Sequence, residues 1–262
     1  MDSDQVIQKV INGKTYIYNR KNDTISLDNG NSYTPKTEGV EVEICHEVTI
    51  NCNHFCENCF SNSGGKGSSS KFLDFSIIKN NIMKYEKNVI RNCISGGEPF
   101  THPHIEKILD LPILFQNCGF VIVTNGTLGN NLDAKLIENR WCTIVSLHGM
   151  ERAHNFYTKS NSFKTVTNRI AKLASKGCVH IHTVIHNHIQ IDDIIWLLKF
   201  RDDTGVNNIK FLKPRPFGRY VPLENNLVSN FVDTIHDDKV KIMSKASNIP
   251  FIDVNGIIRR SN

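Results

Sequence analysis

The chain has 262 residues, of which 39% are hydrophobic and 22% are charged, so it is long enough for one large globular domain or two small ones. Its formal charge is +5, but no run of five or more Lys or Arg occurs, so neither a nucleic-acid partner nor a membrane partner is indicated. Eight cysteines are too few for a secreted disulfide scaffold, and no stretch of eighteen apolar residues is present. The N-terminus also lacks the apolar core of a signal peptide. Together these features predict a cytoplasmic protein.

Residues 1–40 form a polar segment with the pattern of a small β-hairpin. Two β-favouring runs, residues 14–18 and 24–27, are separated by Asn22-Asp23 and followed by Asn29-Gly30. Such pairs favour tight turns next to strands. We expect this hairpin to cap the main domain or to form a substrate-docking edge.

From residue 42 the sequence alternates between strand-like and helical runs, which predicts a parallel sheet covered by helices. The expected strands are residues 42–50, 89–94, 120–124, 143–147, 180–185 and 208–212. The expected helices are residues 76–87, 103–115, 132–139, 163–176 and 192–204. Six strands joined by right-handed crossovers would form an α/β fold, a partial (β/α)6 TIM-like barrel.

After residue 212 the alternation weakens. One more helix is expected at residues 226–236, and a short hairpin around Asn255-Gly256. The chain is therefore divided into an N-terminal hairpin or cap at residues 1–40, a barrel at residues 41–221, and a short C-terminal extension, residues 222–262, packed on the barrel.

Three cysteines follow the first expected strand at short spacing. Cys52, Cys56 and Cys59 open a polar, glycine-rich loop, which would place three sulfurs around one concave turn. Thiolates are the usual ligands of iron–sulfur clusters, and a cubane cluster has four irons, so three local cysteines would leave one iron open to a small molecule. From the cysteines alone, a structural zinc site with His54 or Cys45 as the fourth ligand is the alternative.

A second motif, Ser95-Gly96-Gly97-Glu98-Pro99, lies after the second expected strand. Paired glycines let a ligand approach the backbone closely, and a carboxylate can accept a hydrogen bond from an ammonium group. This motif, in this order after the cysteines, favours the cluster interpretation over zinc.

With both motifs, the chain resembles the radical S-adenosylmethionine (radical SAM) superfamily, whose signature is this cysteine spacing followed by a GGEP-type turn. The resemblance covers roughly residues 42–220 and implies a partial barrel, a [4Fe-4S] cluster whose open iron binds SAM, and a flavodoxin- or ferredoxin-type electron donor. Reductive cleavage of SAM would give methionine and a 5′-deoxyadenosyl radical that abstracts a substrate hydrogen. The implied cluster ligands are Cys52, Cys56 and Cys59, and the implied cradle of the methionyl amino group is Gly96, Gly97, Glu98 and Pro99.

One position departs from the family pattern. The family usually has an aromatic residue near the adenine just before the third cysteine, where this chain has Asn58. Phe55 and Phe60 flank the site instead, so Asn58 and Phe55 are the candidates for contact with the adenine.

Polar turns end the other expected strands, where barrel active sites lie. Thr124-Asn125-Gly126 matches the family's "TNG", which is either a tight turn or a cofactor contact. Ser146-Leu147-His148-Gly149 corresponds to the "SIDG" of peptide-modifying members, which implies that Ser146 lies near the carboxylate or ribose of SAM. His148 replaces the usual Asp and could act as an acid, a base or a neutral hydrogen-bond partner. His154-Asn155 likewise stands where His-Asp is usual.

Two further candidates end the last two expected strands. Asn187 lies between His186 and His188, and it is a candidate cofactor contact. Arg215, with Arg219, could clamp a carboxylate or phosphate of SAM or of the substrate, or could belong to a solvated loop.

The remaining cysteines and most histidines are expected to be structural, and a second metal site at the histidines is disfavoured. They include Cys45, Cys93, Cys118, Cys142, Cys178, His180 and His182. No cysteine follows Cys178, so the cysteine-rich extension that carries auxiliary clusters in many peptide-modifying relatives is missing.

The sequence thus predicts a radical SAM enzyme acting on a peptide, such as a ribosomally made precursor. The alternative substrate is a sugar, a nucleoside or another small metabolite. A hypothesis of another class is a non-catalytic zinc or iron–sulfur protein.

Overall fold

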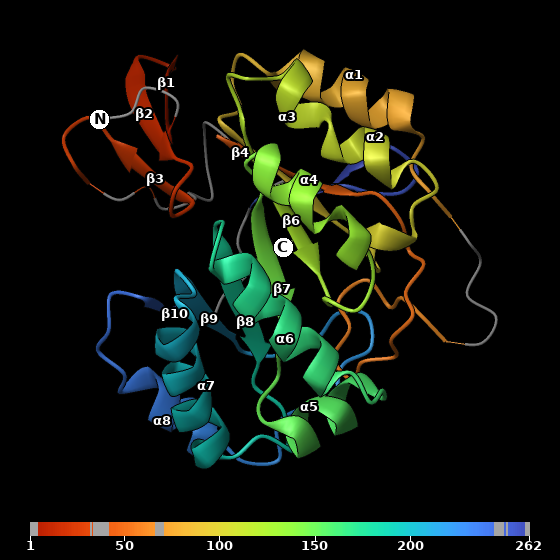
Figure 1. The fold of residues 1–262 in the computed structure, drawn as a ribbon, viewed down its shortest axis with the longest axis vertical. Coiled ribbons are helices and arrows are strands. Elements are labelled where there is room, and N and C mark those ends of the chain that lie inside the picture. Colours follow the sequence, from red (N-terminus) through yellow and green to blue (C-terminus); the bar gives the residue numbers. More distant parts are fainter. Residues whose placement is uncertain are drawn as a thin grey trace.

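The computed structural model describes residues 5–31, 33, 42–65, 71–243, 249 and 251–259. Its centre is a curled, nine-stranded sheet in the order β10-β9-β8-β7-β6-β5-β4-β11-β12, in which every neighbouring pair is parallel except β11 and β12 (Figure 1). The strands are β4 (Glu43–Glu47), β5 (Arg91–Ser95), β6 (Gly119–Thr124), β7 (Cys142–Ser146), β8 (Val179–Val184), β9 (Asn208–Leu212), β10 (Val240–Met243), β11 (Phe251–Ile252) and β12 (Ile258–Arg259).

All six predicted strands are present, so the predicted partial barrel is confirmed, and two more parallel strands extend it. β10 pairs with β9 and β11 pairs with β4, one at each side of the predicted set. The sequence did not indicate β10, which is short and carries two exposed residues in its middle, nor the pairing of the two-residue strand β11 with β4. The expected C-terminal hairpin is present as β11 and β12.

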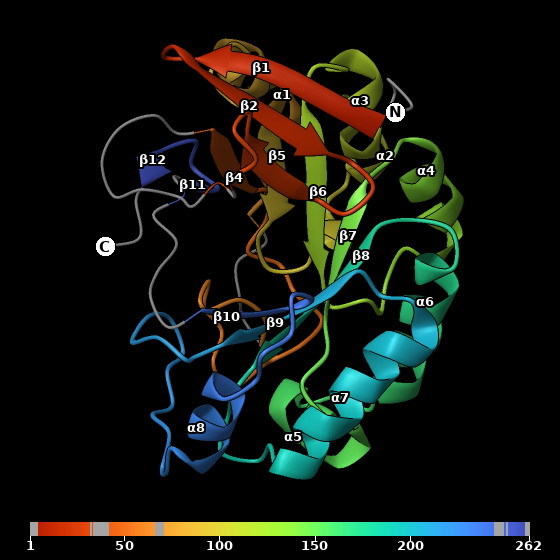
Figure 2. The same ribbon diagram turned by 90° about the vertical axis from the view of Figure 1, so that its left-hand side faces the viewer.

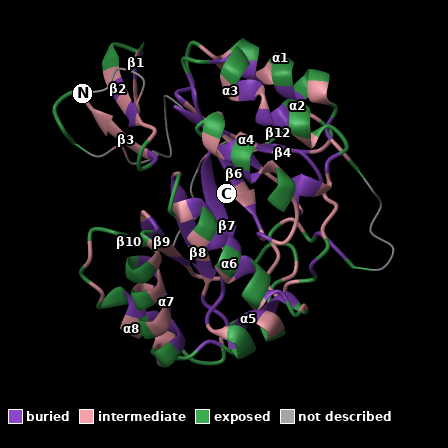
Figure 3. Cartoon of the chain, in the orientation of Figure 1, coloured by how far each residue is buried: buried purple, intermediate pink, exposed green. Residues whose placement is uncertain are grey.

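Helices cover the outer face of this half-barrel (Figures 1 and 2). They are α1 (Phe75–Tyr85), α2 (Ile105–Leu109), α3 (Leu111–Leu114), α4 (Asp133–Glu138), α5 (Glu151–Thr158), α6 (Phe163–Ala174), α7 (Ile191–Thr204) and α8 (Leu227–Asp233), with short 3-10 turns η2 (Pro99–Thr101) and η3 (Asn130–Leu132). Buried side chains follow the strands and the inner faces of the helices, and exposed ones follow the outer faces (Figure 3).

Local signals explain where these helices begin and end. The carboxylate of Asp74 accepts a hydrogen bond from the N–H of Ser76 at 2.7 Å and caps α1. The predicted helix at residues 103–115 is two helices, because Pro112 has no N–H to continue the hydrogen bonding of α2. Helix α5 was not predicted, since its first turns are polar and carry few apolar residues.

The N-terminal hairpin is present and has one strand more than predicted. Strands β1 (Val6–Ile11), β2 (Lys14–Asn19) and β3 (Thr24–Leu27) form an antiparallel sheet at the amino ends of β5 and β6 (Figure 2). The ring of Tyr18 occupies the space that a Cβ at Gly119 would need, 2.0 Å away, and its hydroxyl donates to Asp23 at 2.9 Å. Asp23 in turn pairs with Arg91 of β5 at 2.6 Å. This sheet therefore closes the amino end of the barrel.

Two remaining expectations concern boundaries and membranes. The expected boundary between residues 40 and 41 lies outside the described residues. Among the residues that are described, no helix combines the length and the apolar character needed to cross a membrane.

Candidate functional site

The three predicted cluster ligands lie in one cavity at the carboxyl ends of the central strands. Cys52, Cys56 and Cys59 follow β4 and line this cavity, whose volume is about 150 Å³. Four neighbouring strand ends form its wall, which is why residues far apart in the sequence meet here. The other predicted site residues on the wall are Gly96, Gly97, Thr124, Asn125, Ser146 and His148. We call this space the cysteine cavity.

The three thiols do not form a compact single-metal group in this structure. Among the described residues, the only group of three potential ligand atoms that all lie within 4.8 Å of one another is Cys142, Cys178 and His180. Two sulfur ligands of one zinc ion, each about 2.3 Å from the metal, can be at most about 4.6 Å apart. The loop thiols, with or without His54, do not form such a group in this structure.

Burial disfavours the thiolate form of two of these cysteines, Cys52 and Cys56. It raises the pKa of Cys52 to about 11 and the pKa of Cys56 to about 12. Two backbone amides already face the sulfurs: the N–H of His54 donates to Sγ of Cys52 at 3.4 Å, and the N–H of Ser63 donates to Sγ of Cys59 at 3.3 Å. Metal binding here must therefore release thiol protons, after which these amides stabilise the thiolate charge.

Arg219 holds the cysteine loop in place. Its Nε donates to the carbonyl of Cys56 at 2.9 Å, and its terminal nitrogens donate to Oδ1 of Asn62 at 3.2 Å and to the carbonyl of Ser63 at 2.5 Å. The guanidinium also lies 3.9 Å from the centre of the Phe55 ring. The guanidinium that the sequence suggested as an anion clamp is thus engaged with two backbone carbonyls and one side chain of the loop.

Helix α5, which the sequence did not reveal, supports the same loop from the other side. The carbonyls of Tyr157 and Thr158 at its C-terminal end accept from the N–H groups of Glu57 at 3.1 Å and Phe55 at 3.3 Å. These are carbonyls that a helix end leaves without partners inside the helix. A hydrogen-bonded chain of side chains also joins α5 to the loop, running from His154 through Ser162 and Ser160 to His54. No sequence motif marks these contacts, because they join residues about a hundred positions apart.

The paired glycines of the second motif are required by close backbone packing. A Cβ at Gly96 would lie 2.3 Å from the carbonyl oxygen of Thr49, and one at Gly97 would lie 2.1 Å from that of Asn51. Gly96 also has a φ of +140°, which disfavours other residues. The glycines therefore let the second turn lie directly against the segment that leads into the cysteine loop, with their backbone facing the cavity.

Glu98 joins the second and third strand ends. Its fully buried carboxylate accepts from the hydroxyl of Thr124 at 2.7 Å, the N–H of Asn125 at 2.7 Å and the N–H of Phe100 at 3.2 Å. Burial raises its pKa above the ordinary value, and these hydrogen bonds act in the opposite direction. Neither Glu98 nor the buried Pro99 is among the residues that line the cysteine cavity.

The Thr124-Asn125 turn contacts the cysteine loop directly. Nδ2 of Asn125 donates to Oδ1 of Asn53 at 2.7 Å and lies 3.9 Å from Sγ of Cys52. Oδ1 of Asn125 accepts from the N–H of Thr127 at 3.0 Å. Both interpretations of this segment are therefore compatible with the geometry, since it is a tight turn and also part of the cavity wall.

The His148 ring is a neutral hydrogen-bond acceptor in this structure. Its buried ring accepts from the N–H of Val184 at Nδ1 over 3.1 Å, so a neutral ring carries its proton on Nε2. Burial, and then His154 and His186, hold its pKa well below the ordinary value. Of the three roles that the sequence left open, the geometry favours the neutral partner.

Besides Glu98 and Pro99, four more predicted site residues do not line the cysteine cavity. The Phe55 ring lies under Arg219 and fills the space beside Gly65. Oδ1 of Asn58 accepts from the N–H of Val221 at 2.7 Å. The amide of Asn187 binds the backbone of residues 222 and 224. Asn58 and Arg215 instead line a second cavity of about 610 Å³, where Nη2 of Arg215 lies 3.1 Å from Sδ of Met243.

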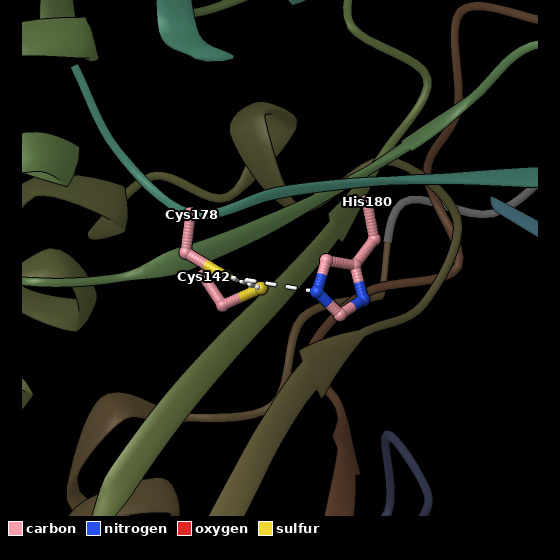
Figure 4. Close-up of side chains that lie close together, drawn as sticks. All are labelled: Cys142, Cys178 and His180. Carbon is pink, nitrogen blue, oxygen red and sulfur yellow. Dashed lines mark hydrogen bonds between the residues drawn. The ribbon is translucent and has the colours of Figure 1, made fainter. Parts of the chain in front are cut away.

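Cys142, Cys178 and His180 form a separate group at the opposite ends of the strands (Figure 4). The two sulfurs are 3.0 Å apart, and Nε2 of His180 is 3.7 Å from Sγ of Cys178. They lie at the amino ends of β7 and β8, beside the N-terminal sheet, where His180 contacts the carbonyl of Asn22 at 3.2 Å. The group is therefore distinct from the cysteine cavity.

Comparison with known proteins points to one family. The family model described as the radical SAM superfamily matches residues 46–200. No curated protein matches the chain at the sequence level.

Solved structures resemble the whole chain at low identity. Streptococcus suis SuiB bound to precursor peptide SuiA has a TM-score of 0.74 and 11% identity, over 98% of this chain and 82% of that one. AdoMet-bound anSMEcpe has a TM-score of 0.64 and 16% identity, over 84% and 74%. Methylornithine synthase (PylB) has a TM-score of 0.55 and 14% identity, over 76% and 58%. At these identities the likeness shows a shared fold.

Proposed function

Because this chain belongs to the radical SAM superfamily, we propose that it is an enzyme that holds a [4Fe-4S] cluster through Cys52, Cys56 and Cys59 and binds SAM beside it. The observation that carries this proposal is that the three cysteines and the paired glycines of the second motif line one cavity. The bound cluster would supply the electron that cleaves SAM and so starts hydrogen abstraction from the substrate.

The chain's own residues would orient SAM in the cysteine cavity. The backbone of Gly96 and Gly97 would accept from the methionyl ammonium group, and Glu98 would hold the adjacent turn in register. Ser146 and Nε2–H of His148 would donate to the carboxylate or ribose of SAM, since both lie on the wall of the same cavity. A neutral His148 would do this without transferring a proton.

The substrate would enter the larger cavity, inside the half-barrel. Ser95 and Val123 line both cavities, so the two spaces adjoin. A volume of about 610 Å³ is suitable for a side chain or a short peptide segment. Likeness to SuiB and to peptide-bound anSMEcpe supports a peptide substrate, whereas likeness to methylornithine synthase supports the alternative of a small metabolite.

A reducing cytoplasm and a flavodoxin- or ferredoxin-type electron donor complete the proposal. All eight cysteines lie in the described part of the chain and are free thiols, which supports a reducing environment.

The test is anaerobic reconstitution with iron and sulfide, followed by dithionite and SAM. Formation of 5′-deoxyadenosine and methionine is the expected result. A colourless zinc protein, or a protein with an intact cluster that leaves SAM unchanged, would refute the enzyme and support the binding-protein hypothesis. Incubation with deuterium-labelled peptides or with deuterium-labelled metabolites, followed by mass spectrometry of 5′-deoxyadenosine, then separates the two substrate classes, because the abstracted deuterium atom appears in that product.

A further inference from the structure

The larger cavity has an unbalanced positive charge. Inward-facing residues of strands β4 to β11 and of the N-terminal sheet line it, and its charged members are Asp23, Glu43, Glu47, Arg91, Lys210, Lys213, Arg215 and Lys241. Several of these are already paired. Arg91 forms ion pairs with Asp23 and Glu43, and Lys213 pairs with Asp233 at 2.7 Å.

Of the eight charged residues named above, five are basic and three are acidic. With these pairs set aside, Lys210 and Lys241, on the adjacent strands β9 and β10, remain as neighbouring basic groups. Lys210 has no hydrogen-bond or ion-pair partner among the described residues, although its side chain is half-buried. A partly desolvated ammonium without a counter-charge is unfavourable, and binding of an anion relieves that cost.

The register of the parallel strands places Lys210 and Lys241 in one row of side chains that starts at the cysteine cavity. Ser146 of β7 is opposite His182 of β8, His182 is opposite Lys210 of β9, and Lys210 is opposite Lys241 of β10. Neighbouring strands are about 4.8 Å apart, so Lys210 lies about 10 Å across the sheet from Ser146. The row therefore runs from the place where SAM would bind into the larger cavity.

The electrostatic coupling within this row agrees with the charge count. Burial, and then Arg91 and Lys241, lower the pKa of Lys210 to about 8. Burial, and then Lys210, hold the pKa of His182 well below its ordinary value. Burial disfavours a charge of either sign, but the contributions of the neighbouring basic side chains have a sign: they disfavour a further positive charge beside Lys210 and His182.

We propose that Lys210, assisted by Lys241, binds a carboxylate of the substrate and so selects an acidic substrate. The statement that the bound carboxylate belongs to a substrate rests on the proposed function, whereas the anion site itself depends only on the cavity. The carboxylate would be held about two strand spacings from Ser146. The reacting carbon would then lie between the carboxylate and the cysteine cavity, a short side-chain length from the carboxylate.

The test measures protection of Lys210 from acetylation in the full-length, anaerobically reconstituted protein. Limiting acetic anhydride is added with glutarate, with inorganic phosphate or with the neutral analogue glutaramide, at constant ionic strength, and each lysine is quantified by mass spectrometry. Glutarate should slow acetylation of Lys210 and glutaramide should not, while the exposed Lys199 of α7 should react alike in all samples. The variant Lys241→Gln should weaken protection by glutarate about tenfold, as expected for loss of one charge-assisted hydrogen bond, and Lys199→Gln should not.

Equal acetylation of Lys210 with glutarate and glutaramide would overturn the proposal. Protection by phosphate alone would overturn the carboxylate assignment. The readout does not depend on SAM cleavage, so protected Lys210 in a protein that forms no 5′-deoxyadenosine would refute the proposed function and leave the anion site intact.

Discussion

Replacing Arg219 by Met should loosen the cysteine loop while leaving the three cysteines in the sequence. The substitution keeps much of the apolar stem but removes three hydrogen bonds, to Cys56, Asn62 and Ser63. Because the guanidinium is half-buried, we assign about 1 kcal/mol to each bond, or about 3 kcal/mol in total. If release of iron requires this loop to open, the population of the open form rises by about a hundredfold.

The assay is the rate at which a ferrous chelator removes iron from the anaerobic, reconstituted protein, followed by absorbance. Arg219→Met should release iron about a hundredfold faster than the parent, whereas Arg152→Met, which changes an exposed arginine on α5, should match the parent. Far-UV circular dichroism checks that the barrel is retained. An unchanged release rate in a folded Arg219→Met protein would refute the assignment of Arg219 as the anchor of the loop.

Three further predictions follow from single contacts. Cys56→Ala should abolish the brown absorption of the reconstituted protein, while Cys178→Ala, at the opposite end of the sheet, should keep it; the reverse pattern would contradict the ligand set. Glu98→Gln places an amide nitrogen against a hydroxyl or an N–H donor and should lower the free energy of unfolding by about 1–3 kcal/mol in urea titrations, and an unchanged midpoint would argue against this junction. Burial lowers the pKa of His46 to about 4, so the unfolded chain takes up a proton that the folded protein does not, and stability falls as the pH drops from about 6.5 toward 4. The slope of the unfolding free energy against pH, measured near pH 5 on the apoprotein, should be smaller in His46→Gln than in the parent by about 1.4 kcal/mol per pH unit. An equal slope in the two proteins would contradict a neutral His46 ring.

The sheet was predictable because hydrophobic runs and turns carry local information. All six central strands lie within a few residues of their predicted positions, and β9 coincides with residues 208–212. Strand β10 pairs with the edge of β9, and β11 pairs with the edge of β4. Such pairing depends on the neighbouring strand, and no local sequence pattern indicates it. Helix α5 was missed because its first turns are polar and carry little of the apolar pattern that indicates a helix.

The site was predictable where a residue type has a special geometry. Three cysteines and two glycines line one cavity, and close backbone packing constrains the identity of the glycines. Glu98, Asn187 and Arg219 were predicted as cofactor or anion contacts, yet each is engaged with the polypeptide in this structure. A polar side chain at a strand end can hold a neighbouring turn as readily as a ligand, and only the folded structure shows which groups it meets.

The supports of the cysteine loop also set an order of events during synthesis. The cysteines lie at residues 52–59, but the carbonyls that fix their loop belong to residues 157 and 158, and the guanidinium that ties it down belongs to Arg219. A nascent chain exposes its three thiols long before the ribosome has made these anchors, because synthesis proceeds from the N-terminus. The loop can therefore take its final shape only after most of the polypeptide has emerged from the ribosome and folded.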